Sequence, residues 1–506
     1  MGVIVPILVL KSEDTEDMSM NGGDSNEGLL YEQVASRFVS LIEKGTLQVG
    51  ERVPSVRRMA AQEGVSISTV VHAYRALEDE GWLEARPQSG YYVRRKVATP
   101  APMSRHLPLL PEPDVSCPEC EPTPVSIVDI SMRVAHVIRD PNMIQLGMAV
   151  CDPNIHPTKQ LNRMLQEVAR SCSNAGNTYN TAPGAPEVRA AIAARSLSAG
   201  CALGPDDVVM TLGCLEALNL CLRAVCEPGD TVVLESPTYF SALQAIEVLG
   251  LRALEVPTHP RDGIVLEALE EVLEREPVKA CLLMPCFSNP LGSRMPEENK
   301  KRLVEMLRER QIPLIEDDIW ADTSFEDPRP KAAKAYDEDG WVMLCSSFSK
   351  TLGPGYRVGW AAPGRWRRKV EYLKLVTNVG NPPLTELAVA EFLKRGGYDH
   401  HLRRVRRLFA EGVECGLRAV GCYFPEGTRV TRPRGGHMLW VELPPKVDGL
   451  ELFEAALRVN ISIAPGQIFS SRHSSHRFIR LNCAYHPPDV IETALKTLGQ
   501  LVEERV

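Results

Sequence analysis

Residues 346–360 read SSFSKTLGPGYRVGW and follow a short apolar run. A lysine can condense with an aldehyde, hydroxyl groups and a guanidinium can hold a phosphate, and glycines let the backbone approach a ligand closely. The stretch therefore contains the groups that a phosphorylated aldehyde requires, on Ser347, Ser349, Lys350 and Arg357. Alone, a Ser-x-Ser-Lys pattern is weak, because a serine-rich loop with a surface lysine is common.

Four further groups precede this stretch in an order that suits the same ligand. Gly213 and Cys214 lie between a strand-like run and a helix-like run, where backbone N–H groups can cradle a phosphate. Tyr239 can stack on an aromatic ring, the amide of Asn289 can donate to a phenolic oxygen, and Asp317 can pair with a pyridine nitrogen. Read singly, the last three have plainer roles as a strand-end aromatic, a turn former and a helix cap. Together they predict a site for pyridoxal 5'-phosphate (PLP), with the lysine bound to its aldehyde as an imine.

This order resembles that of fold-type I PLP enzymes of the aminotransferase class I family, and the resemblance covers nearly all of residues 140–500. It implies that Asp317 keeps the pyridinium protonated, so that the cofactor can act as an electron sink. It gives Lys350 the covalent attachment and, in an active enzyme, the proton transfer. It also implies that Tyr179 reaches the phosphate of a neighbouring subunit, and hence a homodimer.

Two positions bear on the ligand of such a site. Arg480, in FIRLNCA, matches the arginine that clamps the α-carboxylate of an amino acid, a task for which a planar guanidinium is suited. Trp320 departs from the family, in which the third residue after the pyridine aspartate is often a tyrosine that bonds the cofactor's phenolic oxygen. An indole N–H can only donate, so the proton affinity of the imine and the strength of catalysis stay open.

The elements that would position these residues begin near residue 130. Helical patterns alternate there with short apolar runs such as TVVLE, KACLLMP, IPLIED and WVMLCSS. Strands that alternate with helices predict a mostly parallel sheet with helices on both faces. The expected fold class is α/β: a fold-type I PLP-dependent transferase domain over 131–506 with a small carboxyl-terminal α+β subdomain, preceded by a separate amino-terminal module.

That module, residues 28–97, has the pattern of a winged helix-turn-helix. Apolar spacing predicts a helix from Tyr31 to Lys44, a second one ended by Gly64 and a third one ended by Gly81. The runs WLEAR and YYVRR, separated by PQSG, predict a hairpin. The module carries ten Lys/Arg and eight Asp/Glu in a chain of net charge −8, a balance that permits contact with phosphates without predicting it.

A set of small, turn-forming and helix residues recurs along the whole module: Pro54, Ser55, Arg57, Gly64, Val65, Ser66, Thr69, Val70, Ala73, Tyr74, Ser89 and Gly90. This set resembles the pattern of the GntR family. Helix amino-termini, an outward-facing side chain on the third helix and a wing tip can contact DNA. The expected DNA contacts are Arg57, Ser66, Ser68, Thr69, His72, Ser89 and Gly90. Capping is also the local role expected for Ser66 and Ser68, and turn formation the one expected for Gly90. Ile67 departs from the family's usual arginine, which leaves the operator sequence or the affinity open.

The rest of the chain is expected to serve these two parts. Residues 1–27 are acidic and predict a disordered extension, and 98–130 are proline-rich and predict a linker. Cys117 and Cys120 form a C-x-x-C without partner ligands, which favours a solvated pair over a metal site, and no metal is predicted. Fourteen scattered cysteines and the lack of an apolar run of about 18 residues indicate a reduced, cytoplasmic protein without a membrane span.

A GntR-type module joined to an aminotransferase-like body resembles the MocR-like subfamily of GntR regulators. The resemblance implies operator DNA as a partner, a body that senses PLP or its adduct with an amine, and a homodimer that can be head-to-tail. A working aminotransferase with a vestigial head is the alternative, since Lys350, Asp317, Asn289, Arg357 and Arg480 are all present. A regulator that responds to PLP alone is a third reading, against which the presence of Arg480 favours an amino-acid or amino-carboxylate ligand.

Overall fold

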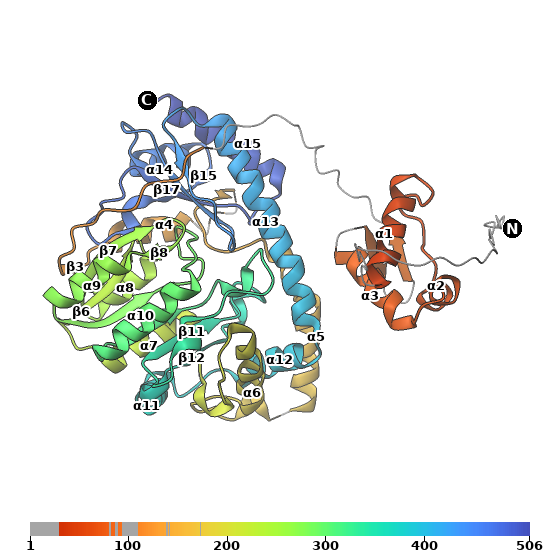
Figure 1. Cartoon of the computed structure of the whole chain (residues 1–506), viewed down its shortest axis with the longest axis horizontal. Coiled ribbons are helices and arrows are strands. Elements are labelled where there is room, and N and C mark those ends of the chain that lie inside the picture. The colour runs from red at the N-terminus through yellow and green to blue at the C-terminus, as the bar shows by residue number, and fades with distance from the viewer. Residues whose placement is uncertain are drawn as a thin grey trace, which may run out of the picture. The chain divides into compact units, whose positions relative to one another are not determined.

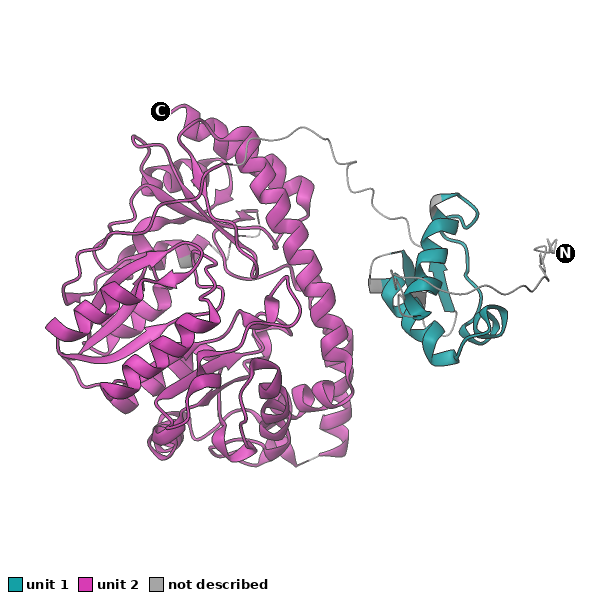
Figure 2. Ribbon diagram, viewed as in Figure 1, with its two compact units in different colours: residues 1–104 teal, residues 105–506 magenta. Residues whose placement is uncertain are grey.

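The computed structural model describes residues 30–79, 82–86, 90–93, 110–137, 140, 142–172 and 174–506. The chain divides into two compact units, residues 1–104 and 105–506 (Figure 2). The predicted extension over 1–27 and the wing-tip residue Ser89 lie outside the described residues.

The smaller unit folds as a winged helix-turn-helix, as the sequence predicts. Its elements are α1 (Leu30–Glu43), α2 (Val56–Glu63), α3 (Ile67–Asp79), β1 (Leu83–Arg86) and β2 (Gly90–Val93). The two strands pair antiparallel. Ser55 caps α2 by accepting a hydrogen bond from the Arg58 N–H (3.4 Å), and Gly64 ends this helix at a φ of 67°, which glycine adopts without strain. The core contains Val34, Phe38, Val70, Tyr74, Leu77 and Val93.

A nine-stranded sheet forms the centre of the larger unit (Figure 1). In spatial order its strands are β3 (Thr123–Pro124), β7 (Arg252–His259), β6 (Thr231–Ser236), β9 (Val278–Leu283), β10 (Leu314–Asp317), β11 (Val342–Ser347), β12 (Gly359–Ala362) and β5 (Val209–Thr211), with β8 (Gly263–Ile264) paired to β7. All neighbours from β7 to β11 are parallel, whereas β12 is antiparallel to both β11 and β5. The predicted α/β class with a mostly parallel sheet is confirmed.

Both faces of this sheet are covered, which explains why its strands read as continuous apolar runs. Along β6, Val232 and Leu234 belong to one core cluster and Val233 to another, as the two-residue period of a strand requires. The first cluster includes residues of α7 (Cys214–Val225), α8 (Phe240–Val248) and α11 (Arg367–Asn378). The second includes residues of α9 (Leu266–Arg275) and α10 (Glu297–Glu309). A third group of helices, α5 (Thr158–Ser171), α6 (Pro186–Ser196) and α12 (Pro383–Lys394), packs together beside β5.

The carboxyl-terminal part of the larger unit has its own sheet and core. The sheet order is β13 (Arg429–Val430), β14 (Met438–Glu442), β17 (Phe478–Asn482) and β16 (Ala464–Pro465), and a separate pair joins β15 (Ile461–Ser462) to β4 (Ile144–Gln145). The helices are α4 (Val128–Val137), α13 (Gly397–Tyr423), α14 (Gly449–Arg458) and α15 (Pro488–Glu503). Figure 1 shows α13 extending from α12 to α15 along one side of the larger unit. Gly412 lets α13 lie close to Cys483, the residue after β17, because a Cβ at position 412 would lie 2.0 Å from the Cys483 carbonyl oxygen.

The sequence predicts a linker over residues 98–130. In the structure, residues 110–127 of this range lie on the larger unit; we call this segment the strap. Its Pro111 carbonyl accepts a hydrogen bond from Val430 N–H (3.0 Å), Glu112 pairs with Arg261, and β3 extends the central sheet. A proline-rich segment makes few hydrogen bonds within itself, so most of its backbone groups can bond to a neighbour. The C-x-x-C pair lies on the strap, where Cys117 is exposed but Cys120 is half-buried against the core, unlike the expected solvated pair.

Candidate functional site

The topology brings the predicted phosphate-binding residues to one edge of the central sheet. Ser347 at the end of β11 is opposite Gly359 at the start of β12, and Gly359 is in turn opposite Thr211 at the end of β5. The loop from β5 to α7 therefore lies next to the loop from β11 to β12. These two loops carry Gly213 and Arg357.

Gly213 and Arg357 are packed together at the amino-terminus of α7. Gly213 has a φ of +91°, and a Cβ on it would lie 2.5 Å from the Nη2 atom of Arg357. A Cβ on Gly359 would lie 2.5 Å from the carbonyl carbon of Gly213, so both positions need glycine for the loops to meet. Arg357 donates to the Leu212 carbonyl oxygen and, at 3.3 Å, to that of Pro354. The first N–H groups of a helix lack intrahelical partners, so the guanidinium and the start of α7 form a site suited to a phosphate.

Two serines border the same loops. Ser347 is buried, and its hydroxyl oxygen accepts a hydrogen bond from the Ser349 N–H at 3.3 Å. The Ser349 side chain is half-buried. Both hydroxyls are thereby placed on the turn that leads from β11 to Lys350.

Asp317 ends β10 and is buried under the start of α7. Its Oδ1 atom accepts hydrogen bonds from the Cys214 thiol (3.3 Å) and from the Ile319 N–H (3.1 Å). Burial raises the pKa of Asp317 to about 6, whereas these two hydrogen bonds act to lower it. The carboxyl group is still mostly ionised at neutral pH, so it can pair with a protonated pyridine nitrogen.

Lys350 lies among groups that hold its amine in place. Its Nζ donates to the Ala149 carbonyl oxygen at 2.6 Å and lies 4.8 Å from the centre of the Trp320 ring. Burial, followed by the nearby charge of Arg480, lowers the pKa of Lys350 from 10.5 to about 8. A larger share of neutral amine is therefore present at neutral pH than for an ordinary lysine, and the neutral amine is the form that attacks an aldehyde.

Arg480 reaches this group from β17 of the smaller sheet. It is 1% exposed, and it donates to Asn289 Oδ1 (2.9 Å) and to the Gly147 carbonyl oxygen (2.6 Å). The Nε atom of Arg480 has no hydrogen-bond partner, and the guanidinium forms no ion pair with the residues that the structure describes. Burial lowers the pKa of Arg480 to about 10. Because Asn289 Oδ1 is occupied, the Asn289 amide NH₂ is the group left to donate to a ligand oxygen.

His437 is a member of this cluster that sequence reasoning missed. It is 1% exposed, its ring is 5.0 Å from that of Trp320, and its Nδ1 has no partner in the described part of the chain. Burial and the neighbouring charge of Lys350 lower the pKa of His437 to about 3, so the ring is neutral. A lone histidine after two glycines carries no sequence signal for this role. The backbone carbonyls of Gly147 and Ala149 were missed as well, because a backbone contact has no residue-type signature.

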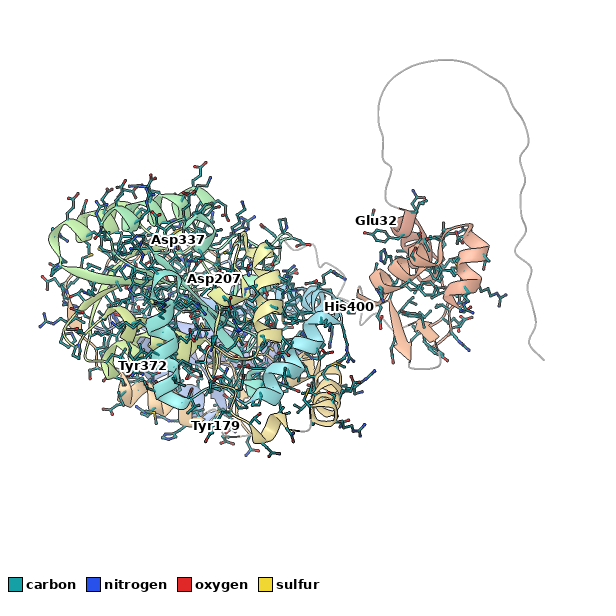
Figure 3. All side chains as sticks on the ribbon, turned by 90° about the horizontal axis from the view of Figure 1, so that it is seen from below. Glu32, Tyr179, Asp207, Asp337, Tyr372 and His400 are labelled. Carbon is teal, nitrogen blue, oxygen red and sulfur yellow. The ribbon has the colours of Figure 1, made fainter. Side chains whose placement is uncertain are left out.

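The remaining predicted residues differ in placement. Tyr239 is half-buried at the start of α8 and packs in the same apolar cluster as Trp320. Tyr179 is 85% exposed and lies at the surface of the larger unit (Figure 3). No hydrogen bond or ring contact among the described residues joins it to another predicted site residue of its own chain. This exposure is what a residue that acts on a neighbouring subunit requires.

The residues expected to contact DNA lie around the start of α3 and on α2. Arg57, Ser68 and His72 are exposed. The Ser66 hydroxyl oxygen accepts a hydrogen bond from the Thr69 N–H (3.1 Å), which is an amino-terminal cap and confirms the local role expected for this serine. Ile67, at the position of the family's arginine, is 53% exposed. Gly90 begins β2 with a φ of +106°.

The residues of the larger unit fit PLP. A guanidinium, two serines and a helix start can hold a phosphate, a buried carboxylate can pair with a pyridine nitrogen, and a lysine with a lowered pKa can bond to an aldehyde. No helix among the described residues is long and apolar enough to cross a membrane.

Comparison with known proteins defines the class. The sequence matches the family aminotransferase class I and II over residues 142–498 and the family of bacterial regulatory proteins, gntR family, over residues 30–93. The chain therefore belongs to the gntR-type regulators whose regulatory module is fused to an aminotransferase class I and II domain. The predicted resemblance to such regulators is confirmed.

Relatives of this architecture cover almost the whole chain. The chain is 41% identical over 479 residues to the uncharacterized HTH-type transcriptional regulator YdcR of Escherichia coli, covering 94% of this chain and 99% of that protein. It is 35% identical over 472 residues to the uncharacterized HTH-type transcriptional regulator YjiR of the same organism, covering 93% and 98%.

Solved aminotransferase structures resemble about three quarters of the chain. LysN, an α-aminoadipate aminotransferase from Thermus thermophilus complexed with N-(5'-phosphopyridoxyl)-L-leucine, has a TM-score of 0.68 and 30% identity, covering 74% of this chain and 97% of that chain. A kynurenine aminotransferase of Pyrococcus horikoshii in complex with PMP has a TM-score of 0.70 and 28% identity, covering 75% and 95%. These likenesses confirm the fold class and PLP as the cofactor of the larger unit.

Proposed function

We propose that the chain is a transcriptional regulator whose larger unit binds PLP through Lys350 and senses an amino acid, and whose smaller unit binds operator DNA. PLP, when bound, supplies a reactive aldehyde and an electron-withdrawing ring. Lys350 provides the amine that attaches it, Asp317 pairs with its ring nitrogen, and Arg357 with the start of α7 holds its phosphate.

The buried guanidinium of Arg480 is the observation that carries the sensing role. A buried charge without an opposite charge is costly, by several kcal/mol per ion. Arg480 has only neutral partners among the described residues, and it is close enough to lower the pKa of Lys350. A carboxylate from a ligand whose amine reaches the Lys350 position would compensate this charge. The favoured ligand is therefore an amino acid or another amino-carboxylate.

Binding to DNA is supported by the smaller unit itself. The starts of α2 and α3 present exposed hydroxyl and guanidinium groups, which suit phosphate contacts. Arg57→Ala in the full chain should weaken binding to all DNA sequences alike and reduce the slope of log K against log salt by about 1. Loss of affinity confined to one sequence would instead assign Arg57 to a base contact.

Assembly as a homodimer, for which a head-to-tail arrangement is one proposed form, is supported in general by exposed apolar side chains of the larger unit. Besides Tyr179, the exposed Tyr372 (63%) and Val376 (56%) lie on α11, and the Ala182 N–H donates to the Val379 carbonyl at the end of this helix (3.1 Å). A cytoplasmic location is supported by the thiols, since all fourteen cysteines are free. Sedimentation of the wild type and of Tyr179→Ala, with PLP affinity measured on both, tests whether this residue completes a neighbouring site.

Transamination is a second candidate function. It is favoured by the complete set of Lys350, Asp317, Asn289 and Arg480 in one cluster, which is what an acting aminotransferase needs. Purified wild type should absorb in the visible, and Lys350→Ala should abolish that band; unchanged absorbance in the variant would remove the site. Rapid formation of keto acid from an amino acid would favour the enzyme, whereas slow or absent turnover with DNA binding favours the sensor.

A further inference from the structure

The strap, residues 110–127, bonds to both parts of the larger unit. On the central sheet, the Thr258 N–H donates to the Ser116 hydroxyl oxygen at 2.8 Å, and Thr123 pairs with Ala253 of β7. On the carboxyl-terminal part, Asp114 forms an ion pair with Arg429. Asp317 ends β10 of the central sheet, Lys350 lies in the turn after β11 of that sheet, and Arg480 lies on β17 of the carboxyl-terminal sheet. A ligand of the site would therefore contact the same two parts of the larger unit as the strap does.

Four consecutive residues, Phe469 to Arg472, connect the site to the strap; we call them the coupling segment. The ring of Phe469 lies 5.0 Å from the guanidinium carbon of Arg480, and its carbonyl oxygen accepts a hydrogen bond from the Thr238 N–H (2.9 Å). The coupling segment therefore begins in direct contact with the charge that we assign to the ligand carboxylate.

The middle of the coupling segment is fixed to a buried acid of the central sheet. The Ser471 N–H donates to Glu255 Oε1 at 2.5 Å, and the Ser470 hydroxyl donates to Glu255 Oε2 at 3.1 Å. Glu255 is 4% exposed and also accepts a hydrogen bond from Ser236 at 2.6 Å. Glu255 lies on β7, the strand that β3 of the strap pairs with, so these hydrogen bonds join the coupling segment to the part of the sheet that the strap extends.

Arg472 ends the coupling segment on the strap. Its Nε donates to the Thr123 hydroxyl oxygen (2.8 Å), and its guanidinium forms ion pairs with Glu119 and, at 3.4 Å, with Glu121. A cavity of about 220 Å³ lies between the coupling segment and the strap, lined by Cys117, Glu119, Glu121, Glu255, Ser470 and Arg472 among others. This space leaves room for the two segments to move against each other.

We propose that Arg472 couples the binding of a carboxylate at Arg480 to the position of the strap, the segment that follows the smaller unit in the sequence. The proposal rests on the proposed function. A carboxylate that bonds to Arg480 competes with its neutral acceptors, so the guanidinium and the Phe469 ring under it take a second position. A ligand shifts such an equilibrium only by binding one arrangement better than the other. In this protein, the arrangements with and without the ligand carboxylate differ in the contact between Arg472 and the strap.

The first test measures the strap in the full-length, PLP-loaded protein. Hydrogen exchange of residues 110–124 is followed with and without an equimolar mixture of the twenty common L-amino acids, and with ethylamine as the carboxylate-free probe. In the wild type, the amino acids should change strap exchange and ethylamine should not. In Arg472→Gln, the change should be lost while the affinity for amino acids, read from the visible band, stays within about twofold.

A matched control separates this effect from the general loss of a surface ion pair. Arg302 also pairs with two glutamates, Glu267 and Glu270, and it lies on α10. Both of these partners are on α9, and neither belongs to the strap. Arg302→Gln should retain the amino-acid response of the strap. Persistence of the response in Arg472→Gln, its absence in the wild type, or its loss in Arg302→Gln would each overturn the proposal.

The second test measures DNA binding by the same full-length variants. Allosteric couplings are typically about 5- to 150-fold in affinity, so amino acids should change wild-type operator affinity by about fivefold or more. The change should fall below about twofold in Arg472→Gln and in the Glu119→Gln, Glu121→Gln double variant. If the wild type binds no DNA, the proposed function fails even where strap exchange responds. If all variants respond alike on DNA, the coupling role of Arg472 alone fails.

Discussion

Replacement of Arg480 by methionine is expected to separate ligand affinity from folding stability. In the free protein this buried guanidinium has no acidic partner among the residues that the structure describes, so its removal relieves a desolvation cost of several kcal/mol. The same change leaves Asn289 Oδ1 and the Gly147 carbonyl oxygen without their donor, at about 1 to 3 kcal/mol each. The two effects oppose each other, so the free energy of unfolding should change by less than about 2 kcal/mol.

The affinity for amino acids should change far more. Loss of one member of a buried, hydrogen-bonded charge pair costs about 2 to 5 kcal/mol, which is about 30- to 5,000-fold in affinity. Titration of the PLP-loaded Arg480→Met variant with the amino-acid mixture, followed by the visible band, measures this loss. Ethylamine has no carboxylate and should bind to the variant and to the wild type within about threefold of each other.

The outcome for the two ligands decides the role of Arg480. A similar loss for ethylamine and for the amino acids would show that the variant has damaged the cofactor site and not a carboxylate site. Wild-type affinity for the amino acids would show that Arg480 does not bind the carboxylate. A fall in the thermal midpoint of more than about 4 °C would contradict the small change expected in the free energy of unfolding.

Three further predictions follow from single positions. The rate at which PLP combines with the PLP-free protein should rise from pH 6 to 10 with a midpoint near 8. The reason is that the lowered pKa of Lys350 makes its amine neutral above that pH. A midpoint near 10.5 would contradict the lowering of this pKa by burial. Gly359→Ala places a Cβ 2.5 Å from Gly213 and should weaken PLP binding by about 5- to 150-fold in a spectroscopic titration, whereas Gly355→Ala, which meets no atom within 4 Å, should not. Tyr74→Phe removes the 2.8 Å hydrogen bond to the backbone carbonyl before α2 and should destabilise the smaller unit by about 1 kcal/mol, measured by hydrogen exchange of α3 in the full chain; unchanged exchange would refute this.

Much of the fold could be predicted because its signals are local. The helices of the smaller unit have regular apolar spacing and end at residues such as Gly64, whose left-handed φ is a property of glycine. The strands of the central sheet are short apolar runs buried on both faces. Asp317 and Ser347 were expected to serve one ligand. They end the neighbouring parallel strands β10 and β11, so the structure places them at the same edge of the sheet.

What could not be predicted depends on contacts between distant segments. The strap has no apolar period, and its position depends on pairs such as Asp114 with Arg429, which are 315 residues apart. His437 is buried beside Lys350 by the packing of β14, and a single histidine in a sequence does not reveal its neighbours. Tyr179 lies at the surface of its own chain, so its predicted role depends on a second subunit.

The most direct test of the account is the binding of the full-length chain to DNA from upstream of its own gene, at low salt, with and without PLP. We predict protection of a defined site by the wild type, an affinity that changes by about fivefold or more when PLP is added, and no such change in Lys350→Ala. Absence of protection under all these conditions, together with rapid conversion of an amino acid to its keto acid, would contradict the account and identify the protein as an enzyme.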